Sequence, residues 1–157
     1  MAKKQLVVIA HAPSPNTARM RDALLRGAQR EAGQTVEARW VAPLEAGPKD
    51  VLGADALILG TTENLGYMSG ALKDFFDRSY YPCLDRTPRL PYALIIRAGN
   101  DGTGTRRAVE SIARGLRWRA IQPPLICRGP WRDEFLAQCE ELGAAVTAGL
   151  ELGIFGS

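Results

Sequence analysis

The sequence predicts an α/β fold of three layers, a doubly wound five-stranded parallel sheet between two layers of helices. Two observations predict it. Short runs of Leu, Ile and Val alternate along the chain with longer segments that repeat apolar residues at helical spacing. The short runs also show little alternation of apolar with polar residues, which is typical of strands buried on both faces of a parallel sheet.

Five strands are expected, at residues 5–10, 35–41, 56–60, 92–97 and 121–127. The last run contains Pro123 and Pro124, and because proline lacks the N–H that a sheet ladder needs, this run suits an edge strand. Right-handed crossovers restrict the topology to a few choices. Among them the strand order 2-1-3-4-5 is expected, with its switch point between the first and third strands.

Helices are expected between the strands, at residues 16–32, 69–80, 105–116 and 133–152, with a short one around 44–52. The first places Met20, Ala23, Leu24 and Ala28 on one face, and Gly33 suits its end. Residues 82–91 are expected to form a loop. No repeat, low-complexity segment or linker divides the chain, so a single domain over residues 1–157 is expected.

Composition narrows the class of protein. A chain that is 46% hydrophobic and 24% charged can bury a core without disulfides. The net charge of +3 comes without a basic block, so nucleic acid is not an expected partner. The odd cysteine count, without metal-ligand spacing, suggests reduced thiols and no metal. The amino-terminal apolar run is too short for a signal peptide or a membrane span, so a cytoplasmic protein is expected.

The first polar loop follows the first predicted strand. Ser14, Asn16 and Thr17 offer hydrogen-bond donors where the next helix begins. The unpaired N–H groups of a helix start carry partial positive charge and bind phosphate. Ser14 or Asn16 equally suits an ordinary helix cap, so capping and phosphate binding both remain open.

The second loop follows the third strand and combines polar groups with a flat aromatic ring and a thioether. Its residues are Thr61, Thr62, Glu63, Asn64, Leu65, Gly66, Tyr67 and Met68. Such a loop suits a ribityl chain, a pyrimidine edge and a ring, although it also fits a surface loop with Tyr67 over the sheet edge. Because loops at a switch point gather at one edge of the sheet, the two loops predict a site for flavin mononucleotide (FMN).

The third loop, residues 98–105, follows the fourth strand and is rich in turn formers, which permits close approach of the backbone to a ligand. Its glycines do not match the dinucleotide fingerprint. Arg106 and Arg107 stand near the start of the next helix, where the helix dipole disfavours positive charge. They are candidates for binding an anionic ligand such as the NADPH phosphate. The alternative is that they are ordinary surface arginines.

In these loops the chain resembles the flavodoxin-like superfamily, and within it the NAD(P)H-dependent FMN reductase and quinone reductase group. The resemblance rests on the Ser14–Thr17 stretch, on residues 60–66, and on the Gly-Ala-Leu-Lys sequence at residues 70–73 with Asp77 after it. The chain departs from the family pattern at Pro15, which removes one backbone donor, and at Thr62, Asn64 and Leu65.

The resemblance implies an FMN site and its residues. The expected cofactor-binding residues are His11, Ser14, Asn16, Thr17, Thr62, Glu63, Asn64, Leu65, Gly66, Tyr67, Met68, Gly99, Asn100, Asp101 and Gly102. The first loop would hold the phosphate, the second the ribityl chain and one side of the ring, and the third the other side of the ring. Hydride would pass from NAD(P)H to the flavin and then to a small acceptor such as a quinone.

No side chain need act as a nucleophile in that reaction, and His11, the only histidine, is a tentative proton donor. A homodimer or homotetramer is also implied, formed through the helix after the third strand. The aromatic residues of this helix support it, since Phe75, Phe76, Tyr80 and Tyr81 are not expected to share one core.

Four alternatives stay open. A flavodoxin-type electron carrier has the same fold, although such carriers are usually acidic and this chain carries a net charge of +3. A non-enzymatic flavin-binding protein would share the site. A hydrolase would use Ser14, His11 and Asp101 as a catalytic triad, but this chain lacks the Gly-x-Ser-x-Gly motif. A receiver domain would need acidic residues where His11 and Thr61 stand.

Overall fold

The computed structural model describes residues 2–31, 33 and 35–156, with the backbone alone at Glu31. It contains one parallel sheet, formed by β1 (Lys4–Ala10), β2 (Val36–Val41), β3 (Ala56–Thr62), β4 (Pro91–Ala98), β5 (Arg119–Ala120) and β6 (Leu125–Arg128). The strand order is β2-β1-β3-β4-β5, and β6 also pairs with β4. The predicted order is therefore confirmed.

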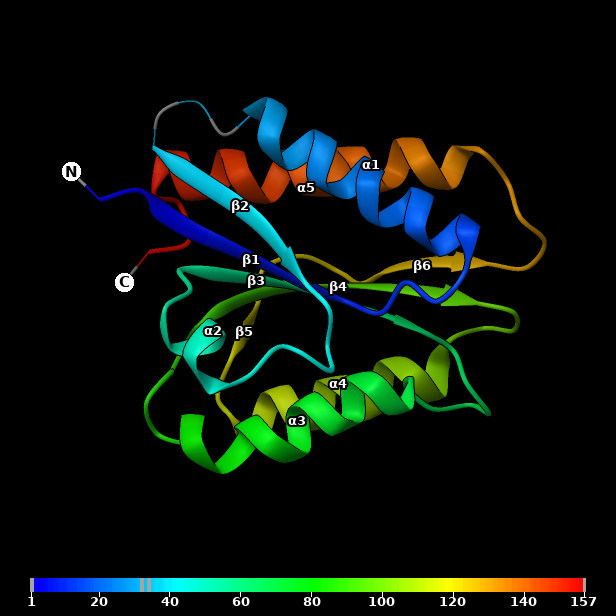
Figure 1. Cartoon of the computed structure of the whole chain (residues 1–157), viewed down its shortest axis with the longest axis horizontal. Coiled ribbons are helices and arrows are strands. Elements are labelled where there is room, and N and C mark those ends of the chain that lie inside the picture. The colour runs from blue at the N-terminus through cyan, green and yellow to red at the C-terminus, as the bar shows by residue number, and fades with distance from the viewer. Residues whose placement is uncertain (1, 32, 34, 157) are drawn as a thin grey trace.

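Helices cover both faces of the sheet (Figure 1). They are α1 (Pro15–Glu31), α2 (Pro48–Leu52), α3 (Gly70–Cys83), α4 (Thr103–Gly115) and α5 (Glu134–Leu152). The helices α1 and α5 lie on one face, and α3 and α4 lie on the other. This three-layer arrangement confirms the predicted doubly wound α/β fold. Among the described residues, none of the helices combines the length and the apolar composition of a membrane span.

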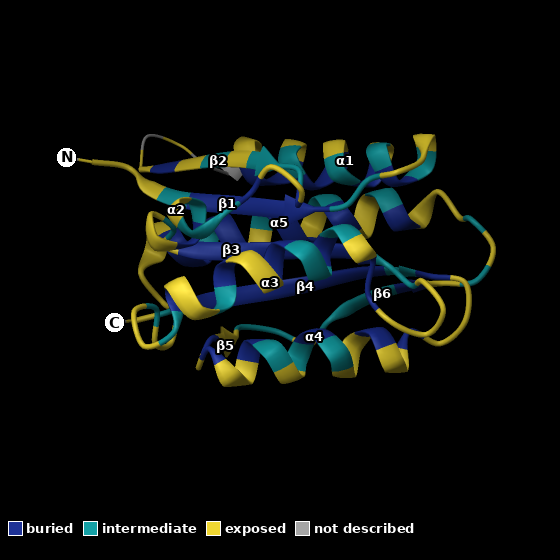
Figure 2. Ribbon diagram, turned by 60° about the horizontal axis from the view of Figure 1, so that its bottom comes forward, coloured by how far each residue is buried: buried dark blue, intermediate teal, exposed yellow. Residues whose placement is uncertain are grey.

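The central strands are buried on both sides, as their apolar sequences predict (Figure 2). Successive side chains of β1 enter different cores. Val7 and Ile9 pack in the core beneath α3 and α4, whereas Leu6 and Val8 pack in the core beneath α1 and α5. This alternation is the period of two of an extended strand.

Three boundary predictions are wrong. The loop expected at residues 82–91 begins later, because α3 continues through Pro82 to Cys83. The fifth strand, expected at residues 121–127, is instead two short strands, β5 and β6, that pair with successive parts of β4. Pro123 and Pro124 lie in the gap between them, where their missing N–H groups cost no ladder hydrogen bond. The short helix expected around residues 44–52 begins only at Pro48. Ala32, the expected end of the first helix, lies outside the described residues.

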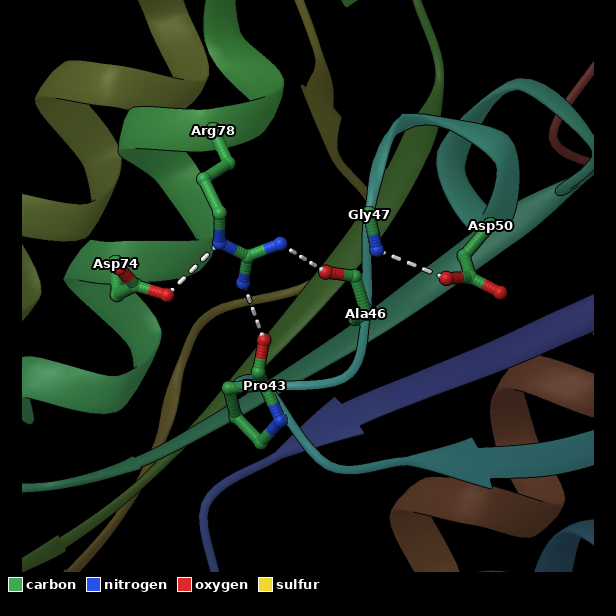
Figure 3. Close-up of polar contacts among 6 residues, drawn as sticks. All are labelled: Pro43, Ala46, Gly47, Asp50, Asp74 and Arg78. Atoms are coloured by element: carbon green, nitrogen blue, oxygen red, sulfur yellow. Dashed lines mark hydrogen bonds and ion pairs between the residues drawn. The ribbon is translucent and has the colours of Figure 1, made fainter.

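Arg78 holds the turn at residues 43–45 that precedes α2 (Figure 3). From α3 its guanidinium donates to the carbonyl oxygens of Ala46 (2.6 Å) and Pro43 (2.9 Å), while Nε contacts the Asp74 carboxylate at 2.8 Å. The N–H of Gly47 donates to the Asp50 carboxylate (2.9 Å) at the start of α2. These bonds satisfy backbone groups that a longer helix would have paired internally.

The aromatic residues of α3 enter the core more fully than expected. Phe75 and Phe76 are buried, and Tyr80 is partly buried against the same core. Tyr81 is 79% exposed. The four rings therefore do not share one core, and the homodimer or homotetramer expected through this helix stays a prediction.

Candidate functional site

The first, second and third loops follow β1, β3 and β4 at the carboxyl ends of these strands. The first and third loops and the beginning of the second surround one cleft of about 480 Å³. The cleft is lined by His11, Pro13, Ser14, Asn16, Thr17, Thr62, Glu63, Asn64, Arg97 and Gly99. Its size lies within the range of small-molecule sites. Residues far apart in sequence thus meet at the switch point of the sheet, as the strand order predicts.

The start of α1 is capped by its own side chains. The hydroxyl of Ser14 accepts the N–H of Thr17 (3.2 Å), and the hydroxyl of Thr17 accepts the N–H of Ser14 (2.9 Å). The two hydroxyl oxygens lie 2.8 Å apart. The capping role left open by the sequence is therefore present. It accounts for two N–H groups that a ligand would otherwise have used.

Two prolines further reduce the backbone donors of this loop, because Pro13 and Pro15 carry no N–H. The N–H of Asn16 has no protein acceptor within the described part of the chain. One O–H is enough to join Ser14 and Thr17, since either hydroxyl can be the donor. The Thr17 hydroxyl also reaches the carbonyl oxygen of Ser14 (3.1 Å). When Thr17 donates to the Ser14 hydroxyl instead, the Ser14 O–H is available to a ligand.

The second loop is a tight turn that projects beside the cleft. Asn64 and Tyr67 exchange two backbone hydrogen bonds of 2.9 Å across it. At its tip Leu65 and Gly66 have φ angles of 53° and 76°. A positive φ is uncommon for leucine, and this side chain lies entirely in solvent. Tyr67 is 42% exposed, so the turn presents two apolar side chains beside the site.

Glu63 fixes the third loop against the second. One carboxylate oxygen accepts the N–H of Asn100 (2.7 Å), and the other accepts the N–H of Gly102 (2.8 Å). The N–H of Glu63 itself donates to the carbonyl of Arg97 (2.9 Å). A carboxylate that accepts two backbone N–H groups holds both loops in one geometry. Glu63, expected to bind the ligand, thus has a positioning role within the protein.

The start of α4 holds the turn from the other side. The hydroxyl of Thr105 donates to the carbonyl of Tyr67 (2.9 Å). At Gly104 an added Cβ would collide with the carbonyl oxygen of Gly66. Glycine at position 104 therefore permits the helix to lie directly against the turn.

Several predicted residues do not line the cleft. Met68 is 2% exposed and packs in the core under α3 and α4, so an expected ring contact is instead a core side chain. Asp101 points to the start of α4, where its carboxylate accepts the N–H of Thr103 (3.0 Å), and this bond lowers the pKa of Asp101. Gly102 is the left-handed residue before α4. Leu65, Gly66, Tyr67 and Asn100 belong to the surrounding loops without lining the cleft.

His11 lies at the end of β1 and lines the cleft. The backbone N–H of His11 donates to the carbonyl of Gly60 (3.0 Å), which fixes the backbone at the first loop. Partial burial lowers the pKa of His11 below its ordinary value of 6.5. The imidazole is consequently neutral at pH 7.

Arg97 is a lining residue that the sequence reasoning missed. One guanidinium nitrogen donates to the carbonyls of Ala98 and Cys127, both at 3.0 Å. The guanidinium also lies 5.1 Å from the ring centre of Phe135 and 5.8 Å from that of Trp131. An arginine that ends an otherwise apolar strand was the available signal, since a charge there needs a functional or structural partner.

Several solved structures share this fold over nearly their whole length. The chain superimposes on a flavodoxin from the domain Archaea with a TM-score of 0.79 at 17% identity, covering 94% of this chain and 99% of that one. The fold is flavodoxin-like. No protein family model and no curated protein matches the sequence.

Two further structures extend the flavodoxin-like comparison. A WrbA-like flavodoxin from Agrobacterium tumefaciens matches with a TM-score of 0.73 at 17% identity, over 96% of this chain and 99% of that one. An oxidoreductase from Corynebacterium diphtheriae matches with a TM-score of 0.67 at 14% identity, over the full length of both chains. At sequence identities of 14% and 17%, structural similarity shows that these proteins share a fold.

Proposed function

We propose that this chain binds FMN in the cleft and acts as an NAD(P)H-dependent oxidoreductase that passes electrons to a quinone or similar small acceptor. The observation that carries the proposal is the meeting of three loops at the switch point of a flavodoxin-like sheet. A hydroxyl-rich helix start lies on one side of the cleft, and two loops joined by Glu63 lie on the other. The proteins of similar structure include flavodoxins and an oxidoreductase.

The donors at the start of α1 fit a phosphate group. The N–H of Asn16 is available there, the O–H of Ser14 joins it when Thr17 donates to the Ser14 hydroxyl, and the positive end of the helix dipole adds to them. The amide of Asn16 makes only a long contact of 3.4 Å with Arg19. With two prolines in this loop, the side chains of Ser14 and Asn16 would supply much of the phosphate binding.

The opposite side of the cleft fits a flat ring. Gly99 lines the cleft, and a Cβ added there would meet no protein atom, so a ligand can approach the backbone closely. Thr62 and Asn64 also line it and hydrogen-bond each other at 2.8 Å. Leu65 and Tyr67 supply exposed apolar surface on the adjacent turn.

Bound FMN would supply the transfer of hydride and single electrons. The chain's own residues bind and orient it. Glu63 keeps the third loop in place, and the neutral imidazole of His11 at the end of β1 can accept or donate a proton beside the cleft.

The test is the visible spectrum of the purified protein after addition of FMN and removal of unbound flavin. We expect a retained flavin spectrum that bleaches anaerobically with NADPH or NADH.

Asn16→Ala should weaken FMN binding at least tenfold, because a hydrogen bond to a charged group contributes about 1.5–3 kcal/mol. Arg89→Ala, far from the cleft on the loop before β4, serves as the control. A protein that neither retains FMN nor quenches its fluorescence would refute the proposal.

An electron carrier is the second candidate, because flavodoxins are among the proteins of similar structure and length. The two exposed apolar side chains beside the cleft would suit protein docking. The same experiment separates the two functions. A bound flavin that bleaches with dithionite but not with NAD(P)H would identify a carrier.

A further inference from the structure

A second concave surface lies beside the cleft, between α4 and the edge strand β6. This hollow of about 380 Å³ is lined by the arginines Arg106, Arg107 and Arg114 of α4 and Arg128 of β6. Glu110 is the acidic side chain in its lining. A concave surface with this excess of guanidinium groups attracts anions.

The positive charge of the hollow is only partly compensated. Glu110 is paired with Arg106 at 3.1 Å. Arg128 donates to the backbone carbonyl of Asp101 (2.9 Å), and its charge also interacts with the carboxylate of Asp101. Within the described part of the chain, Arg107 and Arg114 have no carboxylate partner. They stand seven residues apart, which places both on one face of α4.

One loop borders both the hollow and the FMN cleft. Gly99 lines the cleft and Thr103 lines the hollow. Between them the N–H groups of Asn100 and Gly102 are held by Glu63. A ligand with one end at the cleft can therefore reach the hollow by passing over a short, fixed loop.

We propose that the hollow binds the 2′-phosphate of NADPH and makes the chain selective for NADPH over NADH. This inference rests on the proposed function, which requires a nicotinamide at the cleft. The 2′-phosphate lies at the other end of the dinucleotide, so it needs a cationic site on a neighbouring surface. Guanidinium groups match phosphate oxygens in geometry and charge.

The decisive measurement is calorimetric binding of 2′,5′-ADP and of 5′-AMP, which differ in the 2′-phosphate and cannot transfer hydride. We expect 2′,5′-ADP to bind at least tenfold more tightly, with an affinity that falls as salt is added. The double variant Arg107→Ala/Arg114→Ala should lose at least tenfold in affinity for 2′,5′-ADP and keep its affinity for 5′-AMP.

The control is Arg26→Ala/Arg86→Ala, which removes the same charge from exposed positions outside the hollow. It should bind 2′,5′-ADP as the parent does. Equal affinity for the two nucleotides, or an equal loss in the two double variants, would overturn the inference. Thermal melting of all proteins establishes that each is folded.

Kinetics separate this inference from the proposed function. With FMN bound, the Arg107→Ala/Arg114→Ala variant should show a raised KM for NADPH and an unchanged KM for NADH. If the chain does not bind FMN, the proposed function fails, and the calorimetry still decides whether the hollow recognises a 2′-phosphate.

Discussion

At the scale of single residues, Glu63 controls the shape of the candidate site. Its two carboxylate oxygens accept N–H groups of Asn100 and Gly102, so the loop after β4 is tied to the loop after β3. A carboxylate is suited to this position because both of its oxygens are acceptors. A neutral amide offers one acceptor and turns a donor toward the other N–H.

We expect Glu63→Gln to loosen the third loop. Loss of one hydrogen bond and apposition of two donors should cost about 1–3 kcal/mol locally. Amide hydrogen exchange at Asn100 and Gly102 should accelerate, with less change in the central strands. Glu45→Gln is the matched control, since Glu45 is exposed on the loop after β2. Unchanged protection at both amides would show that Glu63 does not hold the loop.

His11 gives the chain a pH dependence of defined sign. Burial lowers its folded-state pKa below 6.5, so the unfolded chain binds the proton more readily than the folded chain. The contribution of His11 to the stability of the folded state is therefore fully present above about pH 6.5. This contribution is lost as the pH falls through the folded-state pKa of His11. The thermal midpoint should decrease from pH 7.5 to about pH 5, and the decrease should be smaller in His11→Gln. An identical decrease in both proteins would exclude this role.

At the scale of elements, the two helices α1 and α5 pack closely because glycines lie at their contact. A Cβ added to Gly143 of α5 would collide with the carbonyl oxygen of Leu24 in α1. A Cβ added to Gly27 of α1 would likewise collide with the carbonyl oxygen of Glu140. Backbone atoms cannot move aside as a flexible side chain can, so the helices would have to separate.

Gly143→Ala should therefore destabilise the fold by about 2 kcal/mol, the usual cost of overpacking. Gly70→Ala is the control, because a Cβ at Gly70 meets no atom and Ala is the better helix former. That variant should be neutral or more stable by about 0.5 kcal/mol. Urea unfolding of both proteins measures the difference, and equal stability would contradict the predicted collision.

The elements also show where sequence patterns are weak predictors. The strands β1, β3 and β4 lie close to their predicted bounds because long apolar runs are buried whatever their exact neighbours. The segment before α2 depends on Arg78, which lies 31 residues after Gly47 and binds the carbonyls of Ala46 and Pro43. A local pattern contains no information about such a distant partner.

At the scale of the whole molecule, charge is distributed unevenly around the candidate site. The net charge of +3 is small, but the hollow between α4 and β6 concentrates arginines beside the loop that borders the cleft. An acidic surface around the flavin favours basic protein partners, whereas this surface favours an anionic ligand. The charge distribution thus supports the reductase proposal over the carrier.

The sequence by itself determined the order of strands and helices, the strand order of the sheet and the edge where the loops meet. These features follow from hydrophobic periodicity, turn residues and the right-handed crossover, all of which act locally or apply to every chain of this pattern. The tertiary structure alone decided which side chains line the cleft. Met68 lies in the core and Arg97 in the cleft, and Glu63 binds another loop. Each of these outcomes depends on contacts between segments distant in the chain, whose relative positions exist only once the sheet and helices have packed.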